Sequence, residues 1–197
     1  MFPRAYQNVF VLGLLVWGLG IILQQESEEL HTTDLERIKR SGEISIITRN
    51  TPTTYYIGAE GPTGFEYELA TAFARYLGVY PNVIVSDEFS SILPSISRQS
   101  ANVAAAGITV TESRKKYVNF SDSYQEITQL VVYKAGNKKP RSIEDLKGVT
   151  VHVISGSSHE EQINHLHKEY DFLTWQSHDK IDISTLLQKV EDGEFEY

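Results

Sequence analysis

Residues 102–114, NVAAAGITVTESR, decide the fold that we predict for this chain. Residues 102–108 form a short apolar strand, and their small side chains suit a strand that is buried on both faces. Hydroxyl side chains and Arg114 follow it directly. Parallel-sheet proteins place their ligands at the carboxyl ends of such strands. We therefore expect a binding site that uses Gly107, Thr109 and Arg114.

Strands and helices alternate on both sides of this stretch. Helical spacing of apolar residues predicts helices, and short apolar runs rich in β-branched residues predict strands. The expected helices cover residues 34–40, 66–77, 90–99, 159–170 and 183–190. The expected strands cover residues 43–48, 82–85, 126–134, 149–154 and 172–175, and residues 52–64 form a loop. The alternation predicts an α/β fold with mostly parallel sheets, divided into two runs by a polar break at 135–141.

The composition excludes several classes of function. The chain has 197 residues, a formal net charge of −8 and no cysteine, which excludes disulfide scaffolds, thiolate catalysis and zinc–thiolate sites. Its acidity is unlike that of a nucleic-acid-binding protein. The spacing of His159, His165 and His167 does not stack three metal ligands on one helix face. We expect no metal and no cofactor, and we identify no catalytic residue.

The N-terminal segment differs from the rest of the chain. Residues 9–23, VFVLGLLVWGLGIIL, are apolar and uncharged, with Arg4 before them and a polar, acidic stretch after them. This order predicts that residues 1–25 are a secretory signal peptide or a membrane anchor, and that the remainder is exported. Both alternatives stay open. Residues 26–41 are expected to be a linker with one short helix.

Four stretches carry a resemblance to a known family: GFEYELA at 64–70, AAGITVTESR at 105–114, VNFSDSY at 118–124 and IEDLKG at 143–148. In this order they resemble the solute-binding proteins of family 3, the amino-acid-binding proteins of ABC importers. The resemblance implies a periplasmic-binding-protein-like (type II) fold of two lobes that close on a ligand. We expect lobe 1 over residues 42–134 and a partial lobe 2 over 135–197, truncated at Tyr197.

A finer resemblance comes from QLVVYK at 129–134, SGSSHE at 155–160 and VEDGE at 190–194. These stretches resemble the N-terminal sensor domain of the membrane-bound lytic murein transglycosylase F family. In that family a lysozyme-like catalytic domain follows, and we expect it to be absent from this chain. The resemblance implies a periplasmic protein at the outer membrane, with peptidoglycan as the partner of the missing domain.

The resemblance also implies roles for single residues. The family arginine that matches Arg114 holds the α-carboxylate of an amino acid, and a guanidinium does this through two parallel hydrogen bonds. A solvated surface charge is the alternative. Tyr55 and Tyr56 lie in a loop that faces the cleft in the family, where their rings would stack on a ligand or pack on the lobe.

The strand-to-helix turn at Ser157 and Ser158 offers hydroxyl and N–H groups that suit an anion, although any helix also needs such a cap. Gly107 permits close approach of the backbone to a ligand, or forms a plain turn. Asn102 departs from the aspartate that is usual in the importer family, at a position that is generally structural. The family's ammonium-binding carboxylate comes late in lobe 2, beyond what this sequence allows us to read.

Three functions remain open. The first is an exported domain that binds an amino acid or a cell-wall peptide between its lobes, as the regulatory part of a peptidoglycan lytic transglycosylase. The second is the amino-acid receptor of an ABC importer. The third is a structural envelope domain whose cleft has lost its ligand.

Overall fold

The computed structural model describes residues 33–197, and the chain separates into two compact units at Gly42. The described part of the first unit is helix α2 (Asp34–Ser41). Thr33 and Glu36 form a reciprocal capping box at its start, and Gly42 ends it with a φ of 73°. The helix expected here is confirmed, whereas the segment 1–25 lies outside the described residues. No helix among residues 33–197 is long and apolar enough to cross a membrane.

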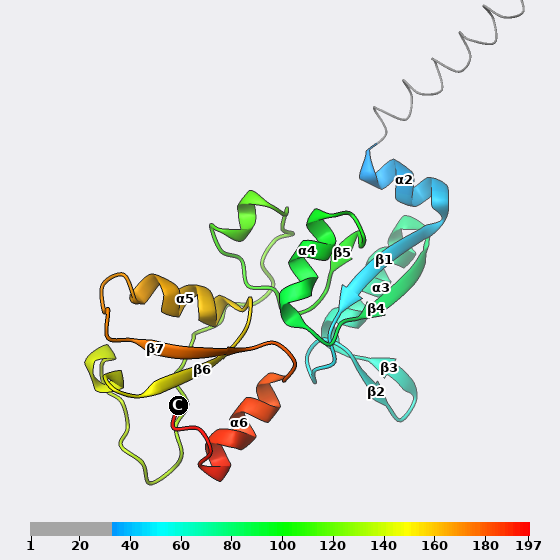
Figure 1. The fold of residues 1–197 in the computed structure, drawn as a ribbon. Coiled ribbons are helices and arrows are strands. Elements are labelled where there is room, and N and C mark those ends of the chain that lie inside the picture. The colour runs from blue at the N-terminus through cyan, green and yellow to red at the C-terminus, as the bar shows by residue number, and fades with distance from the viewer. Residues whose placement is uncertain (1–32) are drawn as a thin grey trace, which may run out of the picture. The chain divides into compact units, whose positions relative to one another are not determined.

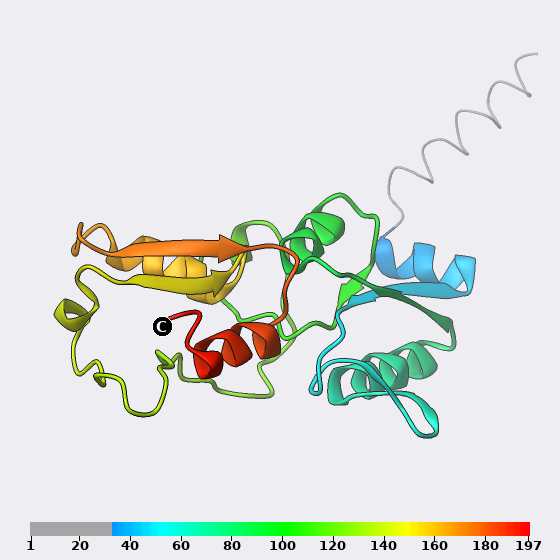
Figure 2. The same cartoon turned by 60° about the horizontal axis from the view of Figure 1, so that its bottom comes forward.

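The second unit begins with a three-stranded parallel sheet in the order β4-β1-β5. Its strands are β1 (Glu43–Thr48), β4 (Tyr80–Val85) and β5 (Val103–Ala104). Ile44 and Ile46 on one face of β1 and Ile47 on the other are all buried, because helices lie on opposite sides of this strand (Figure 2). These helices are α3 (Phe65–Leu77) and α4 (Ile92–Ser97), the latter preceded by the 3₁₀ turn η1 (Phe89–Ser91). The expected parallel α/β arrangement is confirmed.

Asn102 ties β1 to the segment that leads into β5. Its Oδ1 accepts hydrogen bonds from the N–H and the hydroxyl of Ser45, both at 2.9 Å. An aspartate oxygen would accept the same two bonds, so the departure from the family pattern leaves this structural contact intact.

The segment expected to be a loop at 52–64 contains a short antiparallel hairpin. Its strands are β2 (Tyr56–Gly58) and β3 (Gly61–Thr63), as Figure 1 shows. Strands of three residues are too short to show an alternating pattern, so the sequence predicts only a loop here.

A second parallel sheet pairs β6 (Thr150–Ile154) with β7 (Thr174–His178). Helices α5 (Ser158–Leu166) and α6 (Ile183–Asp192) flank it, and the 3₁₀ turn η3 (Ile143–Leu146) precedes it (Figure 1). Leu146, Ile163, Leu173 and Tyr197 form its buried core. The two strands and the helices α5 and α6 appear where the sequence predicts them, with ends displaced by a few residues.

The strand expected at 126–134 is wrong. These residues form no strand in the structure, and Leu130, Val131 and Val132 are exposed. A strand exists only when its backbone N–H and C=O groups pair with a neighbour, and no described strand pairs with this segment. The apolar residues at 126–134 therefore predict a strand that the structure does not contain.

Candidate ligand-binding site

A cavity of about 710 Å³ lies at the carboxyl ends of β1, β5 and β6. This is the edge at which parallel sheets place their ligands. Among the residues that line it are Arg49, Glu66, Phe89, Gly107, Thr109, Phe120, Ser157, Ser158 and His159. A smaller cavity of about 390 Å³ lies against α5, α6 and residues 129–132, and its lining is mostly aliphatic. We assign the candidate site to the larger cavity because charged and hydroxyl side chains converge there.

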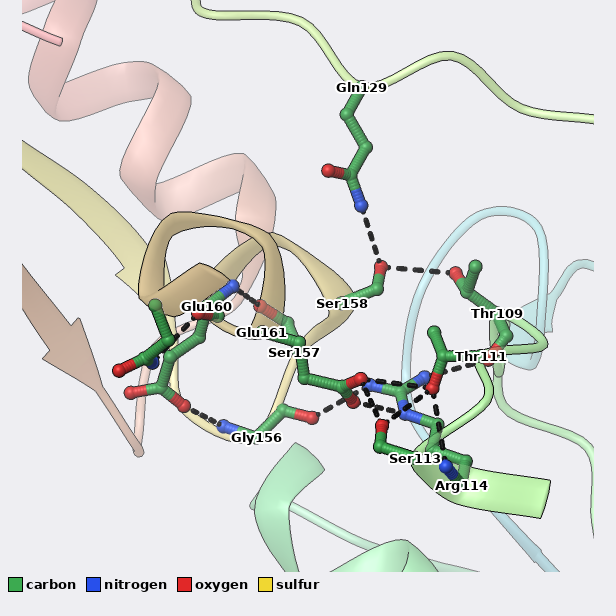
Figure 3. Close-up of polar contacts among 11 residues, drawn as sticks. Thr109, Thr111, Ser113, Arg114, Gln129, Gly156, Ser157, Ser158, Glu160 and Glu161 are labelled. Carbon is green, nitrogen blue, oxygen red and sulfur yellow. Dashed lines mark hydrogen bonds and ion pairs between the residues drawn. The ribbon is translucent and has the colours of Figure 1, made fainter. Parts of the chain in front are cut away.

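Arg114 begins the 3₁₀ turn η2 (Arg114–Lys116) and is only 3% exposed. Its Nε donates to Glu161 Oε1 at 2.6 Å (Figure 3). Its terminal nitrogens donate to the carbonyl oxygens of Thr109, at 3.0 Å, and Gly156, at 2.9 Å. The guanidinium is thus held on three sides by the protein and is not part of the cavity lining.

Glu161, on α5, is the negative partner of this arginine. Its Oε2 also accepts hydrogen bonds from Thr111, at 2.9 Å, and Ser113, at 2.6 Å. Burial alone would raise the pKa of the Glu161 carboxyl, but the bonds from Ser113 and Thr111 and the charge of Arg114 together hold it below its ordinary value. The carboxylate therefore binds α5 to the loop between β5 and η2.

Ser157 and Ser158 open α5, and both are buried. Ser157 caps the helix by accepting the N–H of Glu160 at 3.2 Å. The Ser158 hydroxyl donates to Thr109 Oγ1 at 3.2 Å and accepts from Gln129 at 3.1 Å (Figure 3). Ser157 therefore caps α5, and both serines line the cavity. The two roles that the sequence left open are compatible with each other.

Gly107 lies at the end of β5 with a φ of 68°, which favours glycine. Its N–H donates to Glu66 Oε2 at 2.8 Å, and the same carboxylate accepts the hydroxyl of Tyr124. Burial and the bond to Glu66 raise the pKa of Tyr124, so the phenol stays a donor. Glu66 therefore joins Gly107 and Tyr124, which also line the cavity.

The structure brings together four of the seven sequence-predicted site residues on the cavity lining: Gly107, Thr109, Ser157 and Ser158. Arg114 contacts the backbone of Thr109 and Gly156 but does not line the cavity. Tyr55 packs edge-to-face on Tyr67, with ring centroids 5.4 Å apart, and Tyr56 is 40% exposed on β2. Neither tyrosine lines the cavity.

Sequence reasoning missed Arg49, Phe89 and His159. Arg49 directly follows β1, so the strand-end rule that singled out Arg114 applies equally to it. Burial, together with the nearby Arg114 and Arg49, lowers the pKa of His159 and favours its neutral form. Residues 33–197 contain no cluster of three or more histidine, aspartate or glutamate side chains suited to a metal ion.

Comparison with known proteins places this geometry in a family. The sequence pattern of the bacterial extracellular solute-binding proteins, family 3, matches residues 36–195. The chain belongs to this family. Among solved structures, it is similar to an ancestral arginine-binding protein bound to arginine, with 34% identity and a TM-score of 0.68 over 79% of this chain and 68% of that one. It is also similar to a mutant of ArgBP from T. maritima, with 28% identity and a TM-score of 0.71 over 83% and 70%. The periplasmic-binding-protein-like fold is thereby confirmed.

Curated relatives of this family 3 chain carry a more specific name. It is 43% identical to membrane-bound lytic murein transglycosylase F of Saccharophagus degradans, over 84% of this chain and 33% of the relative. It is 37% identical to the protein of the same name from Ectopseudomonas mendocina, over 100% of this chain and 41% of the relative. The chain thus spans about a third to two fifths of the length of these relatives.

Proposed function

We propose that this chain is the ligand-sensing part of a peptidoglycan lytic transglycosylase, and that it binds an amino acid or a cell-wall peptide in the 710 Å³ cavity. The observation that carries the proposal is the convergence of Thr109, Ser157 and Ser158 at the sheet edge of a family 3 chain. The relatives named lytic murein transglycosylase F supply the enzymatic context. We place the protein in the periplasm, attached to the outer membrane through its N-terminal segment.

Arg114 is proposed to hold the carboxylate of the ligand. A guanidinium has five N–H groups, and Glu161, Thr109 and Gly156 use one each. One N–H on each terminal nitrogen remains, and a ligand carboxylate accepts from both only if the cavity lining in front of Arg114 moves apart, because Arg114 is 3% exposed and does not line the cavity. The hydroxyl of Thr109 accepts from Ser158 and keeps its own proton as a further donor to the same anion. Tyr55 and Tyr56 would contact the ligand only if their loop moves toward the cavity.

Titration calorimetry on the purified 197-residue chain in mild detergent tests this function. Free amino acids and muropeptides are the probes. Arg114→Ala should weaken binding by about 10- to 100-fold, because a charge-assisted hydrogen bond contributes about 1.5–3 kcal/mol. Arg114→Lys should restore only part of the loss, since a lysine lacks the planar fork. Lys115→Ala, at an exposed neighbour of Arg114, is the matched control and should bind as wild type does.

Circular dichroism separates loss of binding from loss of folding in these variants. If no amino acid and no muropeptide binds the wild-type chain, the proposed function is wrong. If Arg114→Ala is folded and binds with unchanged affinity, Arg114 is not the carboxylate receptor.

The receptor of an amino-acid importer is the second candidate. Two similar solved structures favour it, since they are of an ancestral arginine-binding protein bound to arginine and to glutamine. The same titration discriminates the two functions. Tight binding of one free amino acid with no binding of muropeptides would favour the importer receptor.

A further inference from the structure

Arg49 is a cation on the cavity wall that the proposed carboxylate site does not use. It follows β1 directly and lines the same cavity as Glu66 and Phe89. Its guanidinium lies over the Phe89 ring, with Cζ 4.7 Å from the ring centroid. This cation–π contact holds the guanidinium beside one wall and uses none of its N–H groups as hydrogen-bond donors.

The guanidinium of Arg49 has no hydrogen-bond or ion-pair partner among residues 33–197, and its Nε is buried without one. Glu66 and Asp182 act on it electrostatically, but both carboxylates are engaged elsewhere. Glu66 accepts from Gly107 and Tyr124, and Asp182 accepts the N–H of Thr185 at 2.7 Å, capping α6. Burial lowers the pKa of Arg49, which reflects the cost of keeping this charge away from water.

Glu66 on the same wall offsets the charge of Arg49 through space, but it forms no hydrogen bond with Arg49, whose donors stay unused among residues 33–197. Arg114 is neutralised by Glu161 at 2.6 Å. Asp122 and Glu126 also belong to the cavity lining, but both side chains are exposed and therefore screened by water. A half-buried arginine with no hydrogen-bond or ion-pair partner in the described part of the chain is a group that a bound anion would stabilise.

We propose that Arg49 binds a second carboxylate of the ligand, so that the cavity selects an amino acid or peptide with an acidic side chain. The inference rests on the proposed function, in which Arg114 and the Thr109 hydroxyl take the first carboxylate. A side-chain carboxylate would accept two N–H groups from the Arg49 guanidinium while Phe89 keeps its cation–π contact with the same group. A ligand with a neutral side chain would leave the buried charge unpaired, which is the basis of discrimination.

L-glutamate and L-glutamine are the probes, because they have nearly the same size and differ in the charge of the side chain. Calorimetry on the 197-residue chain should show glutamate bound at least about tenfold more tightly than glutamine. Arg49→Gln should remove this preference by weakening glutamate and leaving glutamine nearly unchanged. Arg49→Lys should keep part of the preference. Arg98→Gln, which removes an exposed arginine outside the cavity, should behave as wild type.

Each alternative outcome overturns the inference. Arg49 is not the selective group if glutamate keeps its preference in a folded Arg49→Gln variant. A complete preference in Arg49→Lys would overturn the two-bond recognition by the guanidinium, because a point charge would then be sufficient. The inference also falls if wild type binds glutamine as tightly as glutamate, or binds neither. The proposed function survives these results when another amino acid or a muropeptide binds and Arg114→Ala weakens that binding. It falls only when no such ligand binds.

Discussion

Arg114 and Glu161, which lie 47 positions apart in the sequence, form an ion pair in which Nε donates to Oε1 at 2.6 Å. Arg114 is 3% exposed and Glu161 is 34% exposed. The pair joins the turn η2 to the helix α5, and Thr111 and Ser113 bind the second oxygen of the same carboxylate. Because the arginine is buried, the loss of Glu161 would leave an uncompensated charge inside the protein.

Glu161→Gln should destabilise the chain by about 1–2 kcal/mol, because it removes charge-assisted hydrogen bonds while keeping the size of the side chain. Urea denaturation measures the change as a lower midpoint. Glu191→Gln, at an exposed position of α6, is the control and should leave the midpoint unchanged. Equal midpoints for wild type and Glu161→Gln would show that the ion pair adds nothing to stability.

The contribution of Glu161 should also depend on pH. Its folded-state pKa lies below its ordinary value, so the stability that it contributes is present above that ordinary value, about 4.5. It is lost as the pH falls through the lowered folded-state pKa. The difference in unfolding free energy between wild type and Glu161→Gln should therefore shrink on acidification from pH 7, and a constant difference down to pH 3 would contradict this assignment.

Gly156→Ala should be more harmful than Gly148→Ala. Both glycines have a positive φ, 70° and 83°, so both substitutions meet similar backbone strain. A Cβ on Gly156 would lie 2.9 Å from the Cα of Ser90, whereas a Cβ on Gly148 meets no atom within 4 Å. We expect Gly156→Ala to cost about 1–3 kcal/mol more in unfolding free energy, as overpacked sites do. Equal losses of unfolding free energy for the two variants would show that the backbone at Ser90 shifts away from the new Cβ at no cost.

His152 should make the chain less stable in mild acid. Its Nδ1 lies 2.9 Å from Nε2 of His178, and its ring stacks on Phe195 with centroids 3.6 Å apart. Burial, followed by the neighbouring His178, lowers the pKa of His152 below its ordinary value near 6.5. The folded state thus favours the neutral ring, and the stability that this provides is present above pH 6.5 and is lost as the pH falls through the lowered folded-state pKa.

Melting temperatures measured between pH 8 and pH 5 test this dependence. The wild-type value should fall with pH more steeply than that of His152→Asn. His165→Asn, which changes an exposed histidine of α5, should keep the wild-type slope. Parallel profiles for wild type and His152→Asn would exclude His152 as the titrating group.

Local chemistry explains why most of the regular elements were predictable. Thr33 caps α2 and Gly42 ends it, and Gly78 ends α3 in the same left-handed conformation. These devices act within a few residues, so the sequence displays them directly. Which face of a helix is buried depends instead on the elements that pack against it in the folded protein. In α3 the buried positions are Glu66, Ala70 and Ala74, while its larger side chains Leu69, Phe73 and Tyr76 remain exposed.

The sequence by itself determined the α/β class, the parallel sheets and the four cavity-lining residues Gly107, Thr109, Ser157 and Ser158. It did so because strand ends and helix starts are local features, and because parallel strands collect their carboxyl ends at one edge. Only the tertiary structure decided that residues 126–134 lack a strand partner and that Glu161 occupies one side of Arg114. It alone buried the Nε of Arg49 without a hydrogen-bond partner among residues 33–197. Pairing and burial depend on groups that meet through folding across many residues, and no local pattern records them.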